Sequence, residues 1–284
     1  LEHLATYGDT TGRAVLAAAV LGDEPLLRHT AAMRLAEPDP ARRAELLAPL
    51  LADPLKAVRM AATAQLAGID TTLLKSYQRD ALNRGIAEYV AANEHSLDFA
   101  SARLNLGNLR QQLGDPAAAE RDYRLALRID DLFLPAKMNL AVMLSGQGRN
   151  PEAAQLLRAA AAAYPANADV ASSLGLLLAE MGQTEEALTL LRRAADADPR
   201  GLRVRYNLGL LLQQAGRLDE AEAVFREALA VDPDNLDVLY ALADHLVRRG
   251  RRADALAVAE RKIAAHPDAR IGHDLKAHLE RTPR

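Results

Sequence analysis

Asparagine recurs at a fixed spacing in the last two-thirds of the chain. Asn105 and Asn139 are 34 residues apart, and Asn207 lies two such steps beyond Asn139. A carboxamide side chain offers both a donor and an acceptor, so it can pair with a polypeptide backbone whatever side chains that backbone carries. The spacing therefore predicts a row of amide groups suited to holding an extended peptide, interrupted by Ser173 and ended by Ala241.

Aromatic and charged residues accompany this row. Tyr206 and Tyr240 are also 34 residues apart, and aromatic side chains are typical anchors of protein interfaces. The alternative for both tyrosines is packing between adjacent first helices. The predicted partner-binding residues are Asn105, Asn108, Met138, Asn139, Arg203, Tyr206, Asn207, Tyr240 and Asp244.

No catalytic motif accompanies these residues. The chain has neither a glycine-rich phosphate loop followed by Lys-Ser or Lys-Thr nor a Gly-x-Ser-x-Gly nucleophile turn. His273 and His278 are five residues apart, a spacing that places the two side chains poorly for sharing a metal on one helix face. We therefore predict no enzymatic activity, no metal and no cofactor.

A basic cluster lies near the end of the chain. Positive charge there suits the carboxyl end of a helix, where the backbone dipole is negative. A docking site for an acidic partner is the alternative. The cluster consists of Arg248, Arg249, Arg251 and Arg252.

Composition narrows the possible partners. The 284 residues carry a formal net charge of −3, and only 4% are aromatic, so nucleic acid is not an expected partner. No apolar run approaches the roughly 18 residues that a membrane span requires. The absence of cysteine excludes disulfides, cysteine-ligated zinc, iron–sulfur clusters and covalently attached haem within these residues. Alanine and leucine supply most of the apolar mass, which favours packed helices over a sheet.

A 34-residue period organises residues 99–268 into five units, each expected to be a pair of helices. Glycine permits the turn after the first helix, and proline ends the second helix. Asp115, Asn150 and Thr184 are expected to begin second helices as N-caps. The recurring residues are Leu106, Leu140, Leu174, Leu208 and Leu242; Gly114, Gly148, Gly182, Gly216 and Gly250; Ala119, Ala153, Ala187, Ala221 and Ala255; and Pro165, Pro199, Pro233 and Pro267.

Small and large residues are expected to divide the packing. The recurring alanines of the second helices are expected to face small residues of the first helices, such as Gly107, Gly175 and Gly209, so that paired helices approach closely. The larger residues are expected to fill the seam between neighbouring pairs. They are Tyr123, Leu157, Leu191 and Phe225.

These spacings resemble the tetratricopeptide repeat. The fourth unit shows the pattern best, in Leu208-Gly209, Gly216, Ala221, Phe225, Ala228 and Pro233. The early tryptophan of the family is absent, and Arg103, Lys137, Ala171, Arg205 and Leu239 stand at its positions. The resemblance implies an all-α fold, a right-handed αα superhelix, with a capping helix within residues 269–284. It also implies a concave groove lined by the first helix of each repeat.

The asparagine row resembles the peptide-holding groove of O-linked N-acetylglucosamine transferase, although asparagine is common at this position in such repeats. Some family members bind chaperone tails through a carboxylate clamp, whose amides Asn108 and Asn139 match. Leu104, Asp169 and Ser173 stand where that clamp has basic residues. We therefore do not predict recognition of chaperone tails.

The first third has a different, 31-residue period. Leu27-Arg28, Ala31 and Leu35 recur as Val58-Arg59, Ala62 and Leu66. With the leucines that precede Asp53-Pro54, residues 1–70 resemble HEAT-type helical repeats. Residues 71–98 are expected to form a long connecting helix over 72–93 and a turn over 94–98. One continuous superhelix is expected, because each unit buries its apolar face only against its neighbours.

The order of HEAT-like units, a helix and tetratricopeptide repeats resembles the C-terminal region of bacterial multihaem cytochrome c proteins. In those proteins Cys-x-x-Cys-His sites precede the solenoid, and none lies in this sequence. The resemblance implies a periplasmic location, and a cytoplasmic one is the alternative. Because the chain begins at Leu1 without a signal pattern, we interpret it as a piece of a longer or processed protein.

The predicted function is a non-catalytic scaffold that binds a protein or an extended peptide in the groove. One alternative is the docking arm of a haem-bearing electron-transfer protein. Another is a self-associating structural solenoid. The sequence leaves the partner and the oligomeric state open.

Overall fold

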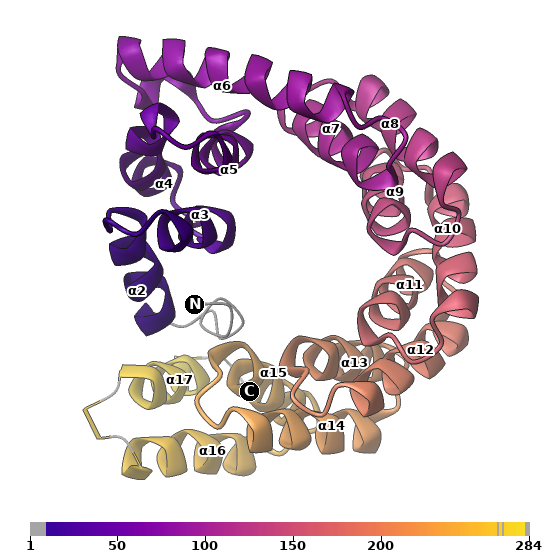
Figure 1. Ribbon diagram of the computed structural model, residues 1–284. Coiled ribbons are helices and arrows are strands. Elements are labelled where there is room, and N and C mark those ends of the chain that lie inside the picture. Colours follow the sequence, from indigo (N-terminus) through magenta and orange to yellow (C-terminus); the bar gives the residue numbers. More distant parts are fainter. Residues whose placement is uncertain (1–9, 266, 269, 282–284) are drawn as a thin grey trace. The chain divides into compact units, whose positions relative to one another are not determined.

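The computed structural model describes residues 10–265, 267–268 and 270–281 (Figure 1). Within these ranges the secondary structure consists of sixteen α-helices and two short 3-10 segments, with no strand. The predicted all-α class is therefore confirmed. The chain divides into two compact units, residues 1–143 and 144–284, and the division falls within helix α9 (Leu134–Gly146).

The first unit begins with helices that enclose a leucine- and alanine-rich core. Leu16, Leu35, Leu47 and Leu66 are almost fully buried in it. The elements are α2 (Thr10–Val20), α3 (Pro25–Arg34), α4 (Pro40–Leu47), η1 (Ala48–Ala52), α5 (Lys56–Leu66), η2 (Thr71–Leu73) and α6 (Ser76–Glu94).

The arginines of the repeated Leu27-Arg28 and Val58-Arg59 pairs make equivalent hydrogen bonds. Arg28 Nη1 donates to the carbonyl oxygens of Gly22 and Asp23, at 3.0 and 2.8 Å. At the equivalent position of the next 31-residue period, Arg59 Nη1 donates to the carbonyl oxygens of Asp53 and Pro54, at 2.8 and 3.0 Å. Each guanidinium thus secures the turn that precedes its own helix. The resemblance to HEAT-type repeats remains a prediction.

The connecting helix α6 begins later than predicted. Asp70 accepts hydrogen bonds from the backbone and hydroxyl of Thr72 at 2.9 and 2.8 Å, which closes the 3-10 segment before Ser76 begins the helix. Gly85 does not interrupt α6. A Cβ atom at Gly85 would lie 2.2 Å from the Thr63 Oγ1 atom, so the glycine lets α5 and α6 pack closely.

Each of the five predicted repeats corresponds to one helix pair, and the starts of the helices follow the predicted period. A final helix, α17 (Arg270–Arg281), buries Leu275 and Leu279. The pairs are α7 (Ala100–Gln112) with α8 (Pro116–Ile129), α9 with α10 (Asn150–Ala163), α11 (Ala168–Glu180) with α12 (Thr184–Ala197), α13 (Leu202–Gln214) with α14 (Leu218–Val231), and α15 (Leu236–Arg248) with α16 (Arg252–Ala265).

The turns follow the predicted chemistry with two exceptions. The five recurring glycines have φ between +73° and +79°, the left-handed region that glycine adopts freely. Asp115 caps α8 by accepting from the backbone N–H of Ala118. Asn150 and Thr184 are not N-caps, because Arg149 and Gln183 occupy those positions and both residues already lie inside their helices.

The packing within a repeat also differs from the prediction. Cβ atoms added to Gly107 and Gly209 would lie 2.6 and 2.4 Å from the rings of Tyr123 and Phe225. These aromatic rings therefore lie against the glycine of their own pair rather than only in the seam between pairs. Because glycine has no side chain, its position on the first helix leaves room for a large aromatic ring from the second helix.

Candidate functional site

The predicted partner-binding residues all lie on first helices, and they form one set in each unit. Asn105 and Asn108 are on α7, and Met138 and Asn139 are on α9, all within the first unit. The second unit carries the others. Arg203, Tyr206 and Asn207 are on α13, and Tyr240 and Asp244 are on α15.

The amides of the first unit bind one another. The Nδ2 atom of Asn139 donates to Oδ1 of Asn108 at 2.7 Å, and the Tyr123 hydroxyl donates to the same oxygen at 2.9 Å. Burial raises the pKa of the Tyr123 hydroxyl, which therefore stays protonated as a donor at neutral pH. The acceptor of Asn108 is thus used twice.

Asn105 is fixed in the same way by a residue that the sequence analysis did not select. Its Nδ2 atom donates at 2.9 Å to Oδ1 of Asn93, in the last turn of α6, and Asn93 donates to the backbone oxygen of Tyr89 at 2.8 Å. Asn93 is 7% exposed. It precedes Asn105 by much less than one repeat, so periodicity carried no signal for it.

These bonds decide which atom of each amide is available. Asn105 and Asn139 each use one of their two N–H donors within the chain, and both residues are half-exposed. Their Oδ1 atoms have no hydrogen-bond partner among the described residues. The bonds fix the orientation of both amides, so the first unit presents from this row two oriented carbonyl oxygens, each beside the second N–H of its own amide.

The candidate residues of the second unit differ in whether they already contact another side chain. Arg203 is exposed, and Tyr206 and Asn207 are half-buried, with no polar partner among the described residues. Tyr240 meets the His278 ring of α17 edge to face, with ring centres 5.9 Å apart, and Asp244 binds Arg248 at 2.6 Å. The contact of Tyr240 is with the last helix rather than with a neighbouring first helix, so packing between first helices stays a prediction for both tyrosines.

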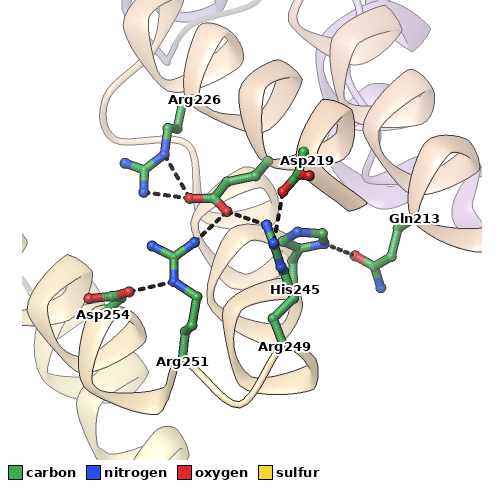
Figure 2. Close-up of polar contacts among 8 residues, drawn as sticks. Gln213, Asp219, Arg226, His245, Arg249, Arg251 and Asp254 are labelled. Atoms are coloured by element: carbon green, nitrogen blue, oxygen red, sulfur yellow. Dashed lines mark hydrogen bonds and ion pairs between the residues drawn. The ribbon is translucent and has the colours of Figure 1, made fainter. Parts of the chain in front are cut away.

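Two arginines of the basic cluster, Arg249 and Arg251, form ion pairs within the protein (Figure 2). Arg249 binds Asp219 and Glu222 at 2.7 and 3.0 Å, and Arg251 binds Glu222 and Asp254 at 2.7 and 2.6 Å. Burial acts in the opposite direction, but the arginines around Glu222, Arg226 foremost, hold the pKa of its carboxyl below the ordinary value. This pairing disfavours the alternative of a docking site for an acidic partner.

His245 is buried beside this cluster and was not selected from the sequence (Figure 2). Its ring meets Phe225 with centres 6.0 Å apart, and its Nδ1 atom lies 3.1 Å from Gln213 Oε1. Burial lowers the pKa of His245, with smaller opposing contributions from Glu222 and the Leu218 backbone. Isolated in the sequence, this histidine gave no sign of its burial.

Two properties of the described ranges bear on function. In residues 10–265, 267–268 and 270–281, no group of three or more histidine or acidic side chains is arranged to hold a metal ion. None of the helices in those ranges is long and apolar enough to cross a membrane.

From α7 to α16 the geometry defines a helical repeat array built from 34-residue helix pairs. A family model described as "Tetratricopeptide repeat" matches residues 104–168 and 172–237, and a second model with that description matches residues 212–279. Together they cover more than half of the chain, which therefore belongs to the tetratricopeptide repeat family. Proteins of this family generally serve as non-catalytic scaffolds for protein interactions.

Solved structures agree with this fold. The chain is similar to YrrB, described as a TPR protein with an unusual peptide-binding site, at 25% identity and a TM-score of 0.53, covering 68% of this chain and 98% of that one. MamA is similar at 18% identity and a TM-score of 0.54, with 65% and 97% covered. PilF of Pseudomonas aeruginosa is similar at 20% identity and a TM-score of 0.54, with 78% and 99% covered. No curated protein matches the chain.

Proposed function

We propose that this chain is a protein-interaction scaffold without catalytic activity of its own, and that it holds a partner protein or extended peptide on the first helices of its repeats. Membership of the tetratricopeptide repeat family supports the scaffold role. The peptide-binding site named in the description of YrrB supports a peptide as the ligand.

One observation carries the proposal: the amides of Asn105 and Asn139 are oriented before any partner arrives. Each donates one N–H within the chain, at 2.9 and 2.7 Å, and each residue is half-exposed with no hydrogen bond at its carbonyl oxygen among the described residues. Such an oxygen can accept a backbone N–H of the partner, at a net gain of about 1 kcal/mol for each bond. Because the side chains are already held, binding loses little rotamer entropy.

The second unit has a candidate surface of its own on α13. Tyr206 offers an aromatic ring with a hydroxyl, Asn207 an amide, and Arg203 an exposed cation. Aromatic and arginine side chains supply much of the binding energy in protein interfaces. We therefore place the strongest anchor of the second unit at Tyr206 rather than at Tyr240, whose ring already contacts His278.

The test compares two variants, one for each unit. Asn105→Ala with Asn139→Ala removes the acceptors of the first unit, and Tyr206→Ala with Asn207→Ala removes the anchor of the second. A partner captured by the wild-type chain is purified and titrated against both. We expect a loss of affinity of roughly tenfold for at least one variant, as the removal of two contacts of about 1 kcal/mol or more predicts.

The matched control places alanine at one position of three second helices. Arg121, Gln155 and Thr189 are exposed and occupy the same position in three successive repeats. This triple variant is expected to bind like the wild-type chain. Equal affinity of the wild-type chain and both first-helix variants would contradict the proposal, and a loss in the control alone would move the site to the second helices.

A further inference from the structure

A cavity of about 490 Å³ lies within the first unit, between the N-terminal helices and the first repeat. Helices α3, α5, α6 and α7 all contribute to its wall. This volume is within the range of about 300–1,000 Å³ that is typical of ligand sites. The lining residues are His29, Met33, Ala57, Met60, Ala61, Ala64, Gln65, Tyr89 and Asn105.

The wall is mostly apolar and adaptable. Met33 and Met60 provide flexible thioether side chains, which adjust their shape to an inserted group. Met33 is 54% exposed, so apolar surface is open to solvent at this cavity. The small side chains of Ala57, Ala61 and Ala64 leave the space that the cavity occupies.

Two amides of the wall are oriented by bonds within the protein. Gln65 Nε2 donates to the backbone oxygen of Met33 at 3.1 Å, and Asn105 Nδ2 donates to Asn93 at 2.9 Å. Asn93 is itself buried and held by Tyr89 O at 2.8 Å, so the orientation of Asn105 is fixed from behind. The amide oxygens Gln65 Oε1 and Asn105 Oδ1 are acceptors without a partner among the described residues.

Charge at the cavity is neutralised or absent. None of the nine lining residues is an aspartate, glutamate, lysine or arginine. The arginines of the neighbouring turns are paired, Arg28 with Asp53 at 2.7 Å and Arg59 with Glu88 at 2.6 Å. A charged ligand would lose its hydration here without gaining an ion pair.

We propose that this cavity binds an uncharged segment of an extended peptide, with bulky apolar side chains among the methionines and backbone N–H groups donating to Asn105 and Gln65. This ligand fits because the wall is uncharged and mostly apolar, and because the amide oxygens of Gln65 and Asn105 can accept its backbone N–H groups. The inference rests on the proposed function, since Asn105 belongs to both sites. It adds that helices upstream of the repeats complete the binding site and set the preference for side chains.

The test uses the methionines as reporters in the full chain. The sequence has five, of which Met33 and Met60 line the cavity, Met138 is in the proposed repeat surface, and Met181 lies in the second unit. Carbon-13 labelled methyl groups are followed by NMR during titration. The probe is the capped peptide acetyl-Ser-Gly-Leu-Phe-Gly-Ser-amide, compared with versions that carry Ala-Ala or Asp-Asp at the centre.

We expect the Leu-Phe peptide to shift the methyl signals of Met33 and Met60 in a saturable way, and to leave Met181 unchanged. The Asp-Asp peptide should shift neither cavity signal. Methylation of the leucine and phenylalanine backbone nitrogens should weaken binding roughly fivefold, because it removes the donors to Asn105 and Gln65.

Two variants test the cavity directly. Met60→Glu places a charge in the wall and should weaken binding about tenfold or more. Leu26→Glu is the matched control, because Leu26 lies on α3 like Met33 but is 74% exposed and outside the cavity, and it should bind like the wild-type chain. An unchanged urea midpoint of unfolding shows that the variants keep their fold.

The outcomes separate this inference from the proposed function. A response of Met138 alone overturns the cavity inference and leaves the proposed function standing. Silence of all five methyl groups toward the Leu-Phe peptide, or an equal response to the Asp-Asp peptide, also overturns the inference. The inference is supported by saturable shifts at Met33 and Met60 of the wild-type chain, when the Met33 shift is lost in Met60→Glu and both shifts persist in Leu26→Glu.

Discussion

The side-chain amide of Asn139 donates at 2.7 Å to Oδ1 of Asn108, and so joins the first helices of two successive repeats. Tyr123, on the second helix of the first repeat, donates to the same oxygen at 2.9 Å. One acceptor therefore fixes three side chains from three helices. This relationship turns a periodic row of amides into a surface of defined polarity.

Replacement of Asn108 is expected to loosen this network. Asn108→Ala leaves half-exposed Asn139 and buried Tyr123 without their shared acceptor, which should cost about 1–3 kcal/mol of unfolding free energy. Tyr123→Phe removes a single donor and should cost less, about 1 kcal/mol. Urea denaturation measures both, and equal stability of Asn108→Ala and the wild-type chain would show that the shared acceptor contributes nothing.

Alanine at two glycines should have opposite effects. Gly209→Ala places a Cβ atom 2.4 Å from the ring of Phe225, which is fully buried and cannot move aside, so we expect a loss of about 1–3 kcal/mol. Gly146 is the matched control. A Cβ atom there has nothing within 4 Å, and Gly146→Ala should be neutral or stabilising by up to about 1 kcal/mol. Thermal unfolding that ranked the two variants in the reverse order would contradict this packing.

Removal of the buried carboxylate of Asp122 should lower the stability of the fold, because two arginines are paired with it. It is 1% exposed and binds Arg103 at 3.2 Å and also Arg110. Asp122→Leu leaves both partly buried arginines unpaired, and we expect a loss of about 2 kcal/mol. Leucine itself suits the position, since Leu156 and Leu190 occupy it in the next two repeats.

The double variant distinguishes the charge effect from the effect of shape. Addition of Arg103→Leu to Asp122→Leu should restore at least half of the lost stability, because a well-packed apolar pair often replaces a buried ion pair at no cost. A double-mutant cycle of denaturation midpoints measures this coupling. Strictly additive losses would show that Arg103 and Asp122 act independently.

His245 should make the second unit less stable in mild acid. Burial lowers the pKa of His245 in the folded chain, whereas in the unfolded chain it titrates near 6.5. Below about pH 6.5 the unfolded state therefore binds the proton more readily, and unfolding free energy falls until the pH is below the folded pKa as well. Above that range both states are neutral and this residue causes no pH dependence.

The measurement is the urea midpoint between pH 7.5 and 5. His245→Phe removes the titrating group while keeping an aromatic ring beside Phe225, and should flatten the decline over this range. The six other histidines of the chain remain in both proteins and serve as the internal reference. A decline of equal size in the variant would mean that His245 is not its source.

Periodicity predicted the repeats well because each repeated residue acts locally. Gly216 turns the chain by its own left-handed conformation, and Pro233 ends a helix by lacking a donor, whatever the surrounding structure. The positions of helix pairs could therefore be predicted from the sequence. The predicted N-cap at Asn150 was wrong, because Arg149 occupies the N-cap position of α10. Pro151 could not decide between the two residues, since proline fits the first turn whether the helix begins at Asn150 or at Pro151.

The site could be predicted only in part, because its polarity depends on contacts between distant residues. Asn105 and Asn139 were identified by spacing, but the direction of each amide is set by Asn93 and Asn108, which no period connects to them. Arg103 stands where the family has a tryptophan, and the sequence pattern did not explain why this position is charged. A buried Asp122 on the facing helix accounts for it.

The most direct test of the scaffold account is site-specific photo-crosslinking in native extract. A photoreactive phenylalanine analogue is placed at Met138 or Tyr206 on first helices, and at Gln155 or Thr189 on second helices as controls. The account predicts that one partner is crosslinked from a first-helix position and is competed by an excess of unlabelled wild-type chain. Crosslinking of that partner only from Gln155 or Thr189 would contradict the account.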